Sequence, residues 1–298
     1  MSFKTALHSV SYAGVWTGQA RLPLPDFLRK AKALGYDGVM LMAKRPHLSV
    51  LEHDAKSCEE LRRLLGDLSL NVICLAGYND FALGRERPDI PMSEMQVLYV
   101  RELARLAQML DCRLIRIFTS YDDLHTPYDQ QWTATVSSLK ECARQAADFG
   151  VTLGVQNHHD MAAHYETMFD LLEEIGEPNC KVMFDAWAPA LQGMDLKAAV
   201  LKMAPYIVHT TVADYVRRPR FHYQPALVNY TRAADSIRAV PMGEGFIDYR
   251  AFFKALVKIG YRGHVAYEMC SPLRGGGSEA NLDSGARRFL EYMKMLQS

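Results

Sequence analysis

The sequence predicts a (βα)₈ barrel, in which eight parallel strands close into a cylinder surrounded by helices. Short apolar strand-like runs alternate with amphipathic helix-like segments along all 298 residues. This alternation is typical of a parallel sheet covered by helices. The length suits one large α/β barrel, and the 49% hydrophobic content supplies its core. We therefore expect a single (βα)₈ domain over residues 1–298. An open, doubly wound sheet fits less well, because no Gly-x-Gly-x-x-Gly turn follows the first strand.

The expected strands are short apolar runs bounded by turn residues. In chain order they cover residues 6–11, 36–42, 71–77, 113–120, 151–156, 180–185, 205–214 and 264–269. The expected helices follow with apolar residues at helical spacing. They cover residues 23–35, 58–68, 93–110, 133–150, 166–176, 195–203, 249–260 and 279–296. Local signals support their ends: Pro25 and Gly35 bracket the first helix, Ser93 is a candidate N-cap of the third, and Gly150 closes the fourth.

Two connections are unusually long for this fold. They follow the second and seventh strands and cover residues 43–57 and 215–247. Connections of this type lie on the carboxyl-terminal face of a barrel, where active sites are built. We therefore expect both to act as long βα loops that wall or cover a site.

Composition excludes several classes of protein. Lys and Arg together number 34, as do Asp and Glu, so the formal net charge is zero. A balanced charge gives no support for a nucleic-acid or anionic-membrane surface. The amino-terminal segment has no long apolar stretch, so a cytoplasmic location is expected. The six cysteines are scattered without metal-site spacing and are expected to be buried thiols in a reducing compartment.

Polar residues stand at the ends of four late strand-like runs, and they are the main functional signal. They are Gln156, Asp185, His209 and Glu268. Because the carboxyl ends of barrel strands converge on one face, these side chains are expected to meet. Carboxylate, amide-oxygen and imidazole ligands suit a divalent cation. The pattern therefore predicts a metal site in an enzyme.

The chain resembles the xylose-isomerase-like barrels, a superfamily of sugar phosphate isomerases and epimerases that includes ketose 3-epimerases and inosose dehydratase. The resemblance covers essentially the whole chain and rests on several motifs in order. They read LGYDGVML, LGVQNHHD, VMFDAWAP, VHTTVADY, GEGFIDY and AYEM. Together they are specific for the superfamily and not for a substrate.

The resemblance implies four metal ligands, namely Glu, Asp, His and Glu at the ends of strands 5 to 8. Asp185 and Glu268 match this pattern, whereas Gln156 stands in place of the first Glu and Thr211 in place of the usual His. His209 lies roughly 6–7 Å deeper on the same face of its strand and could replace that His. We expect Mn²⁺ first, with Mg²⁺, Co²⁺ or Zn²⁺ as alternatives, and also consider weak or absent metal binding.

The chemistry expected from the resemblance is proton abstraction next to a sugar carbonyl, with a bound cation stabilising the enediolate. Glu268 is the expected base, and His158 is the expected second acid or base. Gln156 cannot accept a proton, so it is expected to orient the metal or substrate. Its presence disfavours the usual two-glutamate epimerase mechanism and favours an aldose–ketose isomerase or a lyase.

Four further residues are candidate substrate contacts. His47 lies in the long connection after the second strand, and Trp187 follows Asp185. Arg217 and Arg274 lie after the seventh and eighth strands, where barrels often bind phosphate. The alternatives are aromatic packing for Trp187 and solvated basic loops for the two arginines.

The sequence leaves several functions open. The leading hypothesis is a metal-dependent isomerase or epimerase of a keto-sugar, polyol or sugar acid. A lyase that dehydrates such a substrate or cleaves a 3-keto glycoside is the second hypothesis, and a non-catalytic sugar-binding barrel is the third. Under each, we expect a carbohydrate ligand, no nucleic-acid or membrane partner, and a homo-oligomer, either a dimer or a tetramer.

Overall fold

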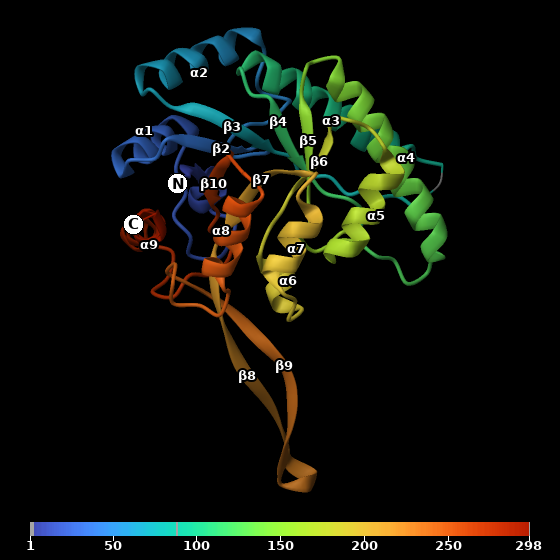
Figure 1. The fold of residues 1–298 in the computed structure, drawn as a ribbon, viewed down its shortest axis with the longest axis vertical. Coiled ribbons are helices and arrows are strands. Elements are labelled where there is room, and N and C mark those ends of the chain that lie inside the picture. Colours follow the sequence, from blue (N-terminus) through green and yellow to red (C-terminus); the bar gives the residue numbers. More distant parts are fainter. Residues whose placement is uncertain (1–2, 88, 298) are drawn as a thin grey trace.

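Eight parallel strands form the closed barrel that the sequence predicts (Figure 1). This computed structural model describes residues 3–87 and 89–297. The barrel strands are β1 Lys4–His8, β2 Gly38–Met42, β3 Asn71–Ala76, β4 Leu114–Ile117, β5 Thr152–Gln156, β6 Cys180–Met183, β7 Ile207–Val212 and β10 His264–Tyr267. Pairing of β1 with both β2 and β10 closes the cylinder.

Helices pack around the outside of the barrel, and most barrel strands are followed in the chain by a helix (Figure 1). They are α1 Leu24–Leu34, α2 Ala55–Asp67, α3 Met92–Met109, α4 Tyr128–Ala147, α5 Tyr165–Ile175, α6 Trp187–Leu191, α7 Leu196–Met203, α8 Tyr249–Lys258 and α9 Glu279–Gln297. No helix among the described residues is both long and apolar enough to cross a membrane.

Two local expectations were wrong. The first strand ends at His8, and the 3₁₀ helix η1 Ser9–Tyr12 follows, because the His8 side chain accepts from the Val10 amide and turns the chain. Ser93 does not cap α3, which begins at Met92; its hydroxyl instead pairs with that of Ser138 at 3.1 Å.

The core has two layers, as a barrel requires. The larger layer lies between the strands and the helices, and the smaller one fills the interior of the barrel. The interior layer consists of Ala6, Met40, Cys74, Ala76, Met183 and Ala266. All six cysteines are free, and only Cys270 is not fully buried. This core supports the polar strand ends above it.

The long connection after β7 folds as a hairpin rather than an irregular loop. Strands β8 Asp214–Gln224 and β9 Asn229–Val240 pair antiparallel and project from the barrel, with the 3₁₀ turn η2 Pro225–Leu227 at the tip (Figure 1). At the base, the Asp214 carboxylate accepts from the Gly243 and Gly245 amides at 3.0 and 2.9 Å. A Cβ at position 245 would collide with that carboxylate, so glycine is required there. This anchor fixes where the hairpin leaves the site.

Candidate active site

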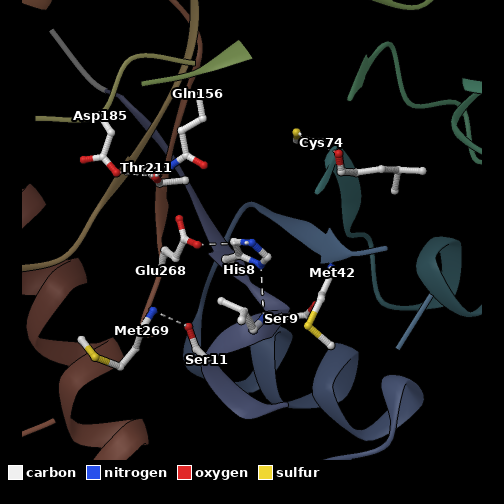
Figure 2. A network of polar contacts seen from close by, with 12 residues as sticks. His8, Ser9, Ser11, Met42, Cys74, Gln156, Asp185, Thr211, Glu268 and Met269 are labelled. Carbon is white, nitrogen blue, oxygen red and sulfur yellow. Dashed lines mark hydrogen bonds and ion pairs between the residues drawn. The ribbon is translucent and has the colours of Figure 1, made fainter. Parts of the chain in front are cut away.

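Three of the predicted strand-end residues meet at the mouth of the barrel, together with Thr211 (Figure 2). Gln156 ends β5, Asp185 follows β6, Thr211 lies in β7 and Glu268 follows β10, and all four side chains are buried. The Gln156 Nε2 lies 3.3 Å from both Asp185 Oδ2 and Thr211 Oγ1. The Thr211 hydroxyl donates to the same Asp185 oxygen at 3.4 Å.

Asp185 is held firmly by its neighbours. Its Oδ1 accepts from the Trp187 amide at 2.8 Å, and the Asn157 side chain bonds both its backbone N–H and C=O. Burial raises the pKa of Asp185 to about 7, helped by the charge of Glu268 and opposed by the Trp187 hydrogen bond. Asp185 can therefore hold or release a proton near neutral pH.

Glu268 faces a neutral histidine. Its Oε1 lies 3.7 Å from His8 Nε2 (Figure 2), and burial raises its pKa while the charge of Arg116 opposes that rise. Burial lowers the pKa of His8 well below its usual value. Because the Val10 amide donates to His8 Nδ1, the neutral ring carries its hydrogen on Nε2, toward the carboxylate. Among the residues that the structure describes, Glu268 is thus a buried carboxylate with no ion pair stronger than this contact to a neutral ring.

Two adjoining cavities open around these residues and share His158, Glu268 and Cys270. The first has a volume of about 240 Å³ and includes Asp185, Trp187 and Thr211 in its lining. The second has a volume of about 340 Å³ and includes Lys44, Tyr78, Asn79, Arg116 and Phe118. Asp185 therefore lies on one side of Glu268, and Lys44 and Arg116 lie on the other.

His158 lies between the two cavities and lines both of them. Its ring packs near Trp187 and Phe118, with centroid separations of 5.3 and 5.7 Å, and its Nδ1 lies against that of His159. Burial lowers the pKa of His158 to about 3, and the charges of His159 and Arg116 add to this effect. The imidazole is therefore neutral at physiological pH and is suited to hydrogen bonding.

Trp187 lines the first cavity, whereas the other three expected substrate contacts line neither. His47 is buried with Nδ1 on the Ser9 hydroxyl at 2.9 Å and Nε2 on the Leu22 carbonyl at 3.1 Å. Both ring nitrogens thus have hydrogen-bond partners, and the residue packs the connection after β2 against η1. The structure gives His47 a structural role instead of the expected substrate contact.

The two arginines are also engaged elsewhere. Arg217 lies in β8 and donates to the carbonyls of Ala190 and Leu191 at 3.0 Å each. Arg274 pairs with Glu244. Arg217 and Arg274 are absent from the linings of the two cavities, and their expected contact with a substrate phosphate stays a prediction.

His209 lies below the predicted metal site. It pairs in register with Met183 of the interior layer and lines neither cavity. Burial and neighbouring His264 lower its pKa to about 3. Thr211 lies two positions further along the strand, and this difference in depth keeps the His209 ring from replacing the missing ligand.

The residues present do not fit the four-ligand metal site that the resemblance implies. Gln156 turns its Nε2 donor, not its oxygen, toward Asp185, and Thr211 offers a hydroxyl where the family pattern has an imidazole. The opposite amide orientation would set an oxygen against a carboxylate. Among residues 3–87 and 89–297, no cluster of three or more His, Cys, Asp or Glu side chains is arranged to hold a metal ion.

The sequence-based predictions missed Arg116 and Lys44. Arg116 lies in β4, where its register partners are Ala76 and Gly154, so it faces the barrel interior. Lys44 follows β2, with its Nζ 3.8 Å from the centre of the Tyr78 ring. A charged residue inside the apolar run LIRI was the available signal, because such a position is rarely buried without a partner.

Comparisons with known proteins agree with this architecture. The fructoselysine 3-epimerase of Escherichia coli O157:H7 is 21% identical over 265 residues, covering 86% of this chain and 89% of that protein. The solved D-psicose 3-epimerase of Clostridium cellulolyticum H10 superposes with a TM-score of 0.74 at 17% identity, covering 98% and 99% of the two chains. The probable 3-DHS dehydratase of Bacillus anthracis gives 0.73 at 16% identity, covering 99% of each.

At these identities the two solved structures establish the fold alone. The family model described as "Xylose isomerase-like TIM barrel" matches residues 28–294, which is most of the chain. The barrel, the motif order and this match agree, and the chain belongs to the xylose isomerase-like TIM barrel family.

Proposed function

We propose that this protein is a sugar isomerase or epimerase that moves a proton at the carbon next to a carbonyl group. One observation carries the proposal: the carboxyl groups of Glu268 and Asp185 are buried in the lining of the same cavity. Burial raises the pKa of both, which suits groups that exchange protons with a substrate. The similarity to fructoselysine 3-epimerase supports a carbohydrate substrate.

The environments of the two carboxyl groups suggest different roles. Glu268, with Arg116 favouring its ionised form, takes the proton from carbon. Asp185, with a pKa of about 7, is protonated in a substantial fraction of molecules at neutral pH and returns a proton. His158, with a pKa of about 3, is too weak a base for the second role that we first expected, and it contacts the substrate instead. Gln156 orients Asp185 through its amide.

A lyase is the second candidate, and Asp185 favours it. A carboxyl group that is protonated in a substantial fraction of molecules near neutral pH can protonate a departing hydroxyl group after Glu268 has removed the neighbouring proton. Product analysis separates the two reactions, because isomerisation conserves mass whereas dehydration loses water.

Solvent exchange tests the proposal. The protein would be incubated in D₂O with a panel of ketoses and keto-acids, and loss of the C–H signal next to the carbonyl would be followed by NMR. We expect exchange with the wild-type protein and a strong reduction with Glu268→Gln. Turnover of a true substrate without any exchange or loss of that C–H bond would contradict both the isomerase and the lyase. A folded protein that binds sugars but neither exchanges nor converts them would instead support the non-catalytic barrel.

Two expectations stay predictions. The homo-oligomer, dimer or tetramer, is measured by light scattering of the purified chain, and the cytoplasmic location by fractionation. Elemental analysis of the purified chain checks the finding that its residues do not fit the four-ligand metal site.

A further inference from the structure

The guanidinium group of Arg116 is buried in the wall of the second cavity, and no acidic residue within the described part of the chain pairs with it. The residue is 1% exposed, and its Nε and Nη1 atoms have no hydrogen-bond partner among the described residues. The rings of Phe118 and Tyr78 flank it, with centroids 4.1 and 4.8 Å from Cζ. Aromatic faces compensate only part of the cost of burying a charge, so the unpaired donors point to a ligand that completes the pairing.

Arg116 is also close to the proposed base. Arg116 and Glu268 line the same cavity, and the guanidinium charge opposes the burial-driven rise in the pKa of Glu268. Neither Arg116 nor neighbouring Lys44 forms an ion pair within the part of the chain that the structure describes. A substrate atom beside Glu268 therefore lies next to two cationic side chains that line the same cavity.

The proposed reaction creates negative charge at this place. When Glu268 takes the proton, the C–H electron pair forms a carbon–carbon double bond, and the carbonyl π electrons move onto oxygen. The product is an enediolate, and no oxidant or reductant is needed. Donors that already point at the developing oxyanion lower its free energy without reorganising. Since Gln156 and Thr211 do not complete the four-ligand metal site, a cationic side chain of the protein itself is the candidate for this stabilisation.

We propose that Arg116 stabilises the enediolate oxygen and so fills the role that a divalent ion has in metal-dependent enzymes of this type. This inference rests on the proposed function, because it assumes that Glu268 generates the enediolate. It makes Arg116 a catalytic residue that touches the reacting oxygen.

Binding of an enediolate mimic tests the inference without turnover. The probe is threonohydroxamate, whose planar anion resembles an enediolate and which also chelates metals. Calorimetry would use protein dialysed against EDTA, and threonamide would serve as the uncharged comparison. We expect the hydroxamate to bind without added metal and Arg116→Met to weaken it by about 10- to 100-fold, the effect of losing a hydrogen bond to a charged group. Threonamide should show little difference between the two proteins.

Two further variants control for charge and for surface arginines. Arg116→Lys keeps a positive charge with fewer donors and should show intermediate affinity. Arg144→Met removes an exposed arginine that pairs with Glu177 on the barrel surface and should bind the hydroxamate like wild type. Equal binding by Arg116→Met and wild type, no binding by the EDTA-treated protein, or binding only after Mn²⁺ is added would each overturn the inference.

Thermal unfolding separates this role from a structural one. A purely structural arginine would lower the unfolding midpoint when replaced. Removal of an unpaired buried charge should instead keep or raise the midpoint, by about 2–4 °C for each kcal/mol gained. A wrong assignment of the base would give a different result. Glu268→Gln would then leave solvent exchange intact, while Arg116→Met would still weaken binding of the hydroxamate.

Discussion

The side-chain amide of Gln156 donates to the carboxylate of Asp185 at 3.3 Å, across the gap between β5 and β6. In the family pattern, a glutamate stands where this amide lies, and two facing carboxylates need a cation between them. Here the amide hydrogens supply the positive end of the contact. The contact between amide and carboxylate therefore needs no cation between its two groups.

Restoring the family ligands should create a metal site. Gln156→Glu with Thr211→His would set a carboxylate and an imidazole beside Asp185 and Glu268. We expect Mn²⁺ to raise the unfolding midpoint of this double variant, whereas the wild type should show little change, because a ligand stabilises only the folded state that binds it. The single variant Gln156→Glu is the control and should respond weakly. An equal response in wild-type protein would show that Asp185 and Glu268 suffice for metal binding.

Loss of the proposed base should abolish most activity. Glu268→Gln keeps the shape of the side chain but cannot take a proton, so we expect turnover of the true substrate to fall by at least about 10²-fold. Circular dichroism and the unfolding midpoint would check that the variant is folded. Retention of more than a tenth of the activity would point to a different base.

Asp185 should make stability depend on pH. Its pKa is raised from 3.8 to about 7 by burial, so between these values the folded protein keeps a proton that the unfolded chain has released. Its contribution to the free energy of unfolding is therefore full below about pH 4 and is lost as the pH rises through about 7.

Asp185→Asn removes this titration and should be more stable relative to wild type at pH 8 than at pH 5. Unfolding midpoints of both proteins at the two pH values would measure the difference. Parallel pH profiles would mean that Asp185 does not have the raised pKa.

His47 should affect folding and not chemistry. His47→Ala would leave the Ser9 hydroxyl and the Leu22 carbonyl without their buried partner, at a cost of about 1–3 kcal/mol of stability. We expect a lower urea midpoint, with kcat and KM of the folded enzyme close to those of wild type. A raised KM with unchanged stability would restore the substrate contact that the sequence first suggested.

The sequence by itself determined the architecture. Barrel strands and helices are specified by local apolar periodicity, which is why each expected strand overlaps an observed one and why Gln156, Asp185 and Glu268 were expected together. Parallel strands bring their carboxyl ends to one face whatever the details of packing. The family motifs depend on the same order of strand ends.

Only the tertiary structure decided the chemistry of individual side chains. The depth of His209, the two partners of His47 and the carbonyl contacts of Arg217 depend on register and on packing between segments distant in the chain. The role of Arg116 could not be predicted for the same reason, since a single charged residue in an apolar run does not reveal whether an acidic partner lies across the barrel. Burial and neighbouring charges determine the pKa values of these side chains and which of their hydrogen-bond donors lack a partner. Burial and neighbouring charges are themselves fixed only when the barrel closes.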